Sequence, residues 1–134
     1  MADVNINLVA VLVAAIVNVV IGFVWYMIFA KPWMALTGKT EKDVKTEKKK
    51  MPLNTGITLG ASLVLAYALS WIVDLAEVTT IAEGALAGLF VGVGVAAMTM
   101  LPNYVWPAKP MKLYFLDSSE VVLGIVVMGI VIAV

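Results

Sequence analysis

Four long apolar stretches constrain this chain more than any other feature of its sequence. Each has about twenty residues or more, and at about 1.5 Å of helical rise per residue that length crosses a hydrocarbon layer of roughly 30 Å. Of the 134 residues, 63% are hydrophobic and 13% are charged, so a lipid bilayer has to serve as the solvent for most of them. We therefore predict an all-α, polytopic membrane protein with a single domain over 1–134 and transmembrane helices at about 6–29, 53–73, 81–101 and 113–134.

The placement of lysine predicts the orientation. All nine cationic residues are Lys, and they fall in the connections 31–52 and 102–112, whereas the chain start and the connection 74–80 carry acids such as Asp3 and Asp74. Because positively charged loops stay in the cytoplasm, we expect both Lys-bearing connections there, an outer loop at 74–80 and both termini outside. Aromatic residues that favour interfaces gather at the same predicted inner boundary: Trp25, Tyr26, Trp33, Tyr104, Trp106 and Tyr114.

Several reactive residue types are missing from the sequence. The chain has no Cys, no His and no Arg, which excludes disulfides, thiol chemistry, imidazole catalysis and the usual transition-metal ligands. The net charge of zero gives no reason to expect nucleic acid as a partner. With no catalytic constellation visible, we expect no enzyme activity, no metal and no cofactor.

Glycines recur at helical spacing in two of the predicted spans. Gly84, Gly88 and Gly92 are each four residues apart and line one face of the third span, and Gly56 with Gly60 makes a similar notch in the second. Such faces let membrane helices approach closely. The stripes predict either packing within the chain or an interface between copies.

Three polar residues inside the spans are candidates for a polar pathway: Asn18, Asp117 and Glu120. Asn18 either hydrogen-bonds to a neighbouring helix or lines that pathway. An acid within the membrane is a functional candidate by default. The alternative is that Asp117 and Glu120 form a capping box at the start of a shorter fourth helix.

Capping boxes and lysines also mark the helix ends. Thr40 with Asp43 predicts the start of a short Lys-rich helix, and Thr80 with Glu83 predicts the start of the third span. Lysines beside the membrane attract anionic headgroups by about 1 kcal/mol each. The candidate lipid contacts are Lys31, Lys48, Lys49, Lys50, Lys109 and Lys112.

Both Lys-bearing connections begin with similar sequences, VWYMIFAKPWM after the first span and VWPAKPMKL after the third. A Val-Trp pair and an Ala-Lys-Pro turn recur in both, followed by an outward-going helix. This pattern predicts two helical hairpins related by a parallel internal repeat. The alternative is chance similarity among residues that favour interfaces.

The same motifs resemble a known family. The residues at the end of the first span and beyond it resemble the start of the family catalogued as domain of unknown function 1761: Trp25, Tyr26, Phe29, Lys31, Trp33, Thr37, Gly38 and Glu41. Asn103, Lys112-Leu113 and the run around Gly124 and Gly129 resemble its later part. The resemblance implies a prokaryotic inner-membrane protein with four helices and no established activity. The resemblance also implies a less acidic stretch with a ring-bearing residue near Glu120, and the Asp-Ser-Ser-Glu segment ending at Glu120 departs from that expectation.

Two functions fit these observations. The first is a structural or interaction subunit, which packs through its glycine faces against copies of itself or other membrane subunits. The alternative is an oligomeric transporter or channel for a small solute or ion, with Asn18, Asp117 and Glu120 along its polar path. The lipid bilayer and anionic headgroups are the partners expected in either case.

Overall fold

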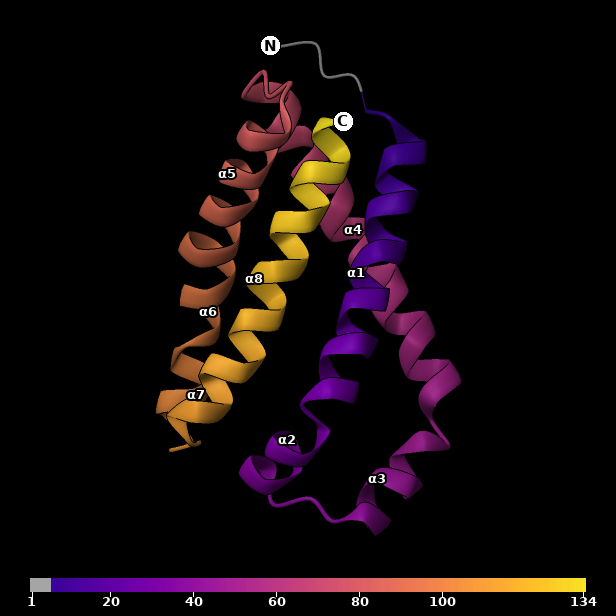
Figure 1. Ribbon diagram of the computed structural model, residues 1–134, viewed down its shortest axis with the longest axis vertical. Coiled ribbons are helices and arrows are strands. Elements are labelled where there is room, and N and C mark those ends of the chain that lie inside the picture. The colour runs from indigo at the N-terminus through magenta and orange to yellow at the C-terminus, as the bar shows by residue number, and fades with distance from the viewer. Residues whose placement is uncertain (1–5) are drawn as a thin grey trace.

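A computed structural model describes residues 6–134, except for the side chains of Val44, Glu47 and Lys48. The predictions for Asp3 and for the Lys48 side chain therefore lie outside the described residues. The all-α fold is confirmed, and the described part of the chain contains four helices long and apolar enough to cross a membrane (Figure 1). They are α1 (Leu8–Ile28), α4 (Met51–Leu75), a composite third helix (Ile81–Val105) and α8 (Met111–Ala133).

The connection between α1 and α4 contains two short helices, α2 (Ala30–Thr37) and α3 (Glu41–Lys48). Gly38 ends α2 in the left-handed conformation, with φ of 73°, which glycine adopts without steric cost. The predicted capping box of α3 is confirmed. The Thr40 amide donates to the Asp43 carboxylate at 3.0 Å, and the Asp43 amide donates to the Thr40 hydroxyl at 3.3 Å.

The third membrane helix is not uniform. It consists of α5 (Ile81–Val91), the π-helical segment η1 (Gly92–Ala97), α6 (Met98–Met100) and α7 (Pro102–Val105). Its predicted capping box is confirmed, because the Glu83 amide donates to the Thr80 hydroxyl at 3.1 Å and that hydroxyl donates to the Glu83 carboxylate at 2.9 Å. Glu83 is therefore a helix-end residue.

Helix α8 lies between α5 and α1, and α4 packs against α1 and, toward its C-terminal end, also against α8 and α5 (Figure 1). The helices thus form two hairpins, α1 with α4 and α5–α7 with α8, which meet mainly through α1 and α8. The buried core lies toward the end of the bundle where α1 starts and α8 finishes, and comprises Val11, Ala14, Ala15, Ala66, Leu69, Val73, Ile125 and Met128. We call the opposite end, which carries α2, α3 and the turn 106–110, the Lys-bearing end.

At the Lys-bearing end, α4 diverges from α1 and α8 (Figure 1). The residues of α4 from Met51 to Ala61 are all exposed or half-buried, whereas Ser62 and several residues after it are buried. The first hairpin is therefore closed at one end and open at the other.

The glycine stripe of the third helix packs within the chain. A Cβ added at Gly84 would lie 2.6 Å from the Gly129 carbonyl oxygen, and one at Gly88 would lie 2.6 Å from the Val126 Cα. Gly92 also faces α8, because a Cβ added there would lie 3.2 Å from the Val122 Cα. These three glycines let the backbones of α5, η1 and α8 touch, so their face is not free for another copy. Gly56 and Gly60 have nothing within 4 Å of an added Cβ.

Candidate functional site

A groove of about 860 Å³ opens between α1, α2, the diverging part of α4 and α8. Its wall combines aromatic and methionine side chains with a group of polar ones. The polar lining residues are Asn18, Asn54, Thr55, Thr58, Asp117 and Glu120, together with the Tyr26 hydroxyl. All three residues predicted for a polar pathway are thus brought to one groove, although they are distant in sequence.

Asp117 is held by two tyrosines. The Tyr26 hydroxyl of α1 donates to Oδ1 at 2.8 Å, and the Tyr104 hydroxyl of α7 donates to Oδ2 at 2.6 Å. Hydrogen bonds from hydroxyls to a carboxylate are short and strong because the acceptor is charged. Each carboxylate oxygen therefore has a partner, and the Tyr26 bond joins the two hairpins.

The residue at which α8 begins shows whether Asp117 and Glu120 lie inside the helix or cap its start. The helix begins at Met111 without a side-chain cap, so Asp117 and Glu120 lie in its second and third turns. At about 1.5 Å per residue, Glu120 is about 13.5 Å along the helix. The capping-box alternative is wrong for this pair, because helix α8 has already formed before either acid.

Glu120 is one turn further than Asp117 on the same face of α8, and it lines the groove. Opposite it is Gly22 of α1, where an added Cβ would lie 3.4 Å from Glu120 Oε1. Within residues 6–134, no hydrogen bond or ion pair to this carboxylate is seen. Of the two acids, Asp117 is occupied by tyrosines and Glu120 is available to a ligand.

Asn18 ties three helices together at the closed end of the groove. Its Nδ2 donates to the Ser62 hydroxyl of α4 at 2.9 Å. Its Oδ1 lies against Gly124 of α8, so closely that any side chain at that position would collide with it. Asn18 therefore serves as the predicted interhelical contact and also lines the groove.

The sequence reasoning missed Tyr26, Tyr104 and Ser62 as site residues. The sequence places both tyrosines among the aromatic residues of the predicted inner boundary, and the structure shows that their hydroxyls donate to Asp117. One feature of the sequence could have indicated these hydrogen bonds: the two tyrosines lie at the same predicted membrane boundary as the two acids. Lys109 lies beside one of these tyrosines, with its ammonium 5.2 Å from the centre of the Tyr104 ring.

The predicted lipid contacts share one location. Lys31 begins α2, Lys49 and Lys50 precede α4, and Lys109 and Lys112 flank the start of α8. All five are exposed at the Lys-bearing end. Contact with anionic headgroups stays a prediction that this placement allows.

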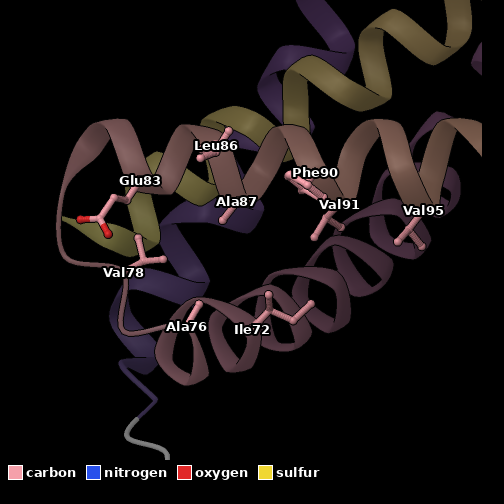
Figure 2. Close-up of a pocket in the computed structure, with 9 residues that line it drawn as sticks. All are labelled: Ile72, Ala76, Val78, Glu83, Leu86, Ala87, Phe90, Val91 and Val95. Carbon is pink, nitrogen blue, oxygen red and sulfur yellow. The ribbon is translucent and has the colours of Figure 1, made fainter.

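A second hollow, of about 420 Å³, lies between the end of α4 and the α5–η1 segment (Figure 2). Figure 2 shows Ala87 and Val91 pointing toward α4, with Ile72 and Ala76 on the facing helix. Its one acid, Glu83, is engaged in the helix cap. This hollow is apolar, and it offers a ligand none of the polar groups found in the groove.

These features define a polytopic helical membrane protein with an acidic groove at one end of its bundle. The chain belongs to the family described as Protein of unknown function (DUF1761), whose profile matches residues 9–133. The resemblance seen in the sequence is thereby confirmed. The comparisons with curated proteins and with solved structures each gave no match.

Proposed function

We propose that this protein binds a small solute in the groove between α1, α4 and α8 and moves it across the membrane. The proposal rests on one observation, which is that Asp117 and Glu120 differ in their hydrogen-bond partners. Each carboxylate oxygen of Asp117 accepts a hydrogen bond from a tyrosine, whereas Glu120 faces the groove with no hydrogen-bond partner among the described residues. Acids that only support packing inside a membrane are paired with protein groups, because an unpaired charge costs several kcal/mol there.

The size and lining of the groove support a binding role. Ligand sites are commonly about 300–1,000 Å³, mostly apolar, with a few polar groups that fix orientation. The groove, at about 860 Å³, has this composition. We infer that the groove binds its solute without catalysis, with the Tyr26–Asp117 hydrogen bond holding α1 against α8.

We infer that the Lys-bearing end faces the cytoplasm of a prokaryotic inner membrane, because positively charged connections are retained on that side. The five exposed lysines at this end support that orientation: Lys31, Lys49, Lys50, Lys109 and Lys112. The groove would then receive solute from the cytoplasmic side.

The absence of cysteine permits a direct test of whether the groove is wet in a bilayer. Thr58 lines the groove, and its neighbour Ile57 is 63% exposed on the outside of the bundle at the same depth. Thr58→Cys should react with a charged maleimide in proteoliposomes at least about tenfold faster than Ile57→Cys, because thiolate forms in water and not in lipid. Equal labelling of the two variants would refute a solvated groove, and with it the transport function.

Self-association is a second candidate, supported by the outer face of α4. There Gly56 and Gly60 lie open beside the exposed side chains of Leu53, Ile57 and Val64. Close packing of small residues drives helix association in lipid. Gly60→Leu should abolish crosslinked dimers in membranes while leaving the monomer folded, and unchanged crosslinking would exclude this face.

A further inference from the structure

We propose that the solute is a lipophilic organic cation, whose charge lies against Glu120 and whose apolar body packs on the aromatic and methionine wall. This inference rests on the proposed function and specifies its substrate class. It is carried by the groove's charge, by its wall and by the hydrogen bonding of Asp117.

Among the residues that the structure describes, the groove lining is acidic, and the Lys39 ammonium lies beside it, 5.0 Å from the centre of the Trp33 ring. Asp117 and Glu120 line the groove, and no lysine among the described residues is part of the lining. An ionised carboxylate at this depth is stabilised by a positive partner, since charges inside a membrane pair with one another. An anionic solute would instead meet like charge and would be rejected.

The wall suits a cation that is also hydrophobic. Phe23, Tyr26 and Trp33 contribute rings, and the faces of such rings attract ammonium and related cations. One face of the Trp33 ring already has the Lys39 ammonium 5.0 Å from the ring centre, so Phe23 and Tyr26 are the rings that this lysine leaves to the solute.

Methionine side chains complete the wall, and they favour binding of variable apolar shapes. Met27, Met34 and Met51 come from three different helices around the groove. Their unbranched, polarizable side chains adapt to irregular surfaces. The groove therefore fits an apolar body of variable shape better than a single rigid metabolite.

A hydrated metal ion fits less well. Both oxygens of Asp117 already accept tyrosine hydrogen bonds, which leaves Glu120 as the one carboxylate to coordinate an ion. Calcium takes six to eight oxygen ligands and magnesium about six. The other free oxygens of the lining belong to uncharged Asn and Thr side chains. Among the described residues, no group of three or more acids is placed to hold a metal ion.

The test uses two ions of nearly the same shape and opposite charge, tetraphenylphosphonium and tetraphenylborate. Purified protein in lipid nanodiscs should bind the phosphonium above the level of empty nanodiscs and should bind the borate at least about tenfold more weakly. Equal binding of both ions, or preference for the borate, would overturn the proposal.

Glu120→Gln should reduce phosphonium affinity at least about tenfold, because it removes the charge and keeps the shape. Glu83→Gln is the matched control, since that acid lies in the other hollow and caps a helix. If Glu120→Gln does not fold, Gly22→Val serves instead by filling the space in front of the carboxylate. Full affinity in the folded variant would contradict the assignment.

Protection of Thr58→Cys separates the two proposals. The phosphonium should slow maleimide labelling at this position, and the borate should not. If Thr58→Cys is labelled but the phosphonium neither binds nor protects it, the substrate class is wrong and the wet groove stands. If Thr58→Cys is not labelled at all, the proposed function itself fails.

Discussion

The two hairpins are built from helices of similar length and hydropathy, yet they pack in opposite ways. In the α5–α8 hairpin, glycines on both helices bring the backbones into contact, with Gly84 against Gly129. In the α1–α4 hairpin, the helices meet near Asn18 and Ser62 and then separate toward the Lys-bearing end. The α5–α8 hairpin is therefore closely packed, whereas the α1–α4 hairpin leaves space for a solute.

The connections explain part of this difference. Residues 106–110 join α7 to α8 in a tight turn, which holds the helix ends together, whereas α2 and α3 occupy the longer connection 29–50 and allow α4 to stand apart. The shared Ala-Lys-Pro sequence also differs in structure. It begins helix α2 at Ala30, but it contains a left-handed residue at Ala108, with φ of 58°. The internal repeat stays a prediction, and local backbone structure does not follow it at this point.

The largest effect should come from a leucine on the glycine face of the closed hairpin. Gly88→Leu would drive a side chain into the backbone of α8 near Val126, and should destabilise the protein by about 3 kcal/mol or more. Thermal unfolding in detergent measures this loss. The matched change in the open hairpin, Gly56→Leu, meets no atom within 4 Å and should leave the melting temperature unchanged. Equal losses would show that the two hairpins pack alike.

The next effect concerns the bond between the hairpins. Asp117→Ala removes the acceptor of two tyrosine hydroxyls and should cost about 2 kcal/mol of stability. Tyr26→Phe removes the bond from the open hairpin alone and should cost about half as much. Chemical denaturation compares the free energy of unfolding of the original protein and the two variants. An unchanged free energy of unfolding in Asp117→Ala would mean that the tyrosine hydrogen bonds do not stabilise the fold.

A smaller coupling is expected where the open hairpin closes. Asn18 and Ser62 form one hydrogen bond, and such interhelical bonds contribute about 1 kcal/mol in membranes. A double-mutant cycle with Asn18→Ala and Ser62→Ala measures that coupling directly. Additive effects of the two changes would mean that apolar packing, and not this hydrogen bond, holds α1 against α4 at this point.

The smallest effect concerns the cap of α3, in the long connection. The backbone amide and hydroxyl of Thr40 hydrogen-bond to Asp43 and hold the pKa of its carboxyl below the usual value. Because the pKa is lowered in the folded helix, the stabilisation is present above the unfolded pKa of about 3.9 and is lost as the pH falls through the folded value. The protection factor of the Thr40 amide, which is its intrinsic exchange rate at a given pH divided by the observed rate, should therefore fall in acid. Asp43→Asn should remove that pH dependence, and a pH dependence that persists would assign it to another group.

The sequence by itself determined the four spans, the two confirmed capping boxes and the family. These features depend on local properties: the length of an apolar run, or two residues three positions apart. It also identified Asn18, Asp117 and Glu120 as unusual, because a polar group in a long apolar stretch is visible without knowing its neighbours.

Only the tertiary structure decided what those polar residues contact. The partners of Asp117 are 91 and 13 residues away along the chain, and that of Asn18 is 44 residues away, so no local pattern specifies them. The glycine stripes look alike in sequence, yet Gly88 touches α8 and Gly60 touches nothing, since the packing of each helix depends on where its neighbours lie. The groove exists because α4 diverges from α1, and that divergence is a property of the assembled bundle.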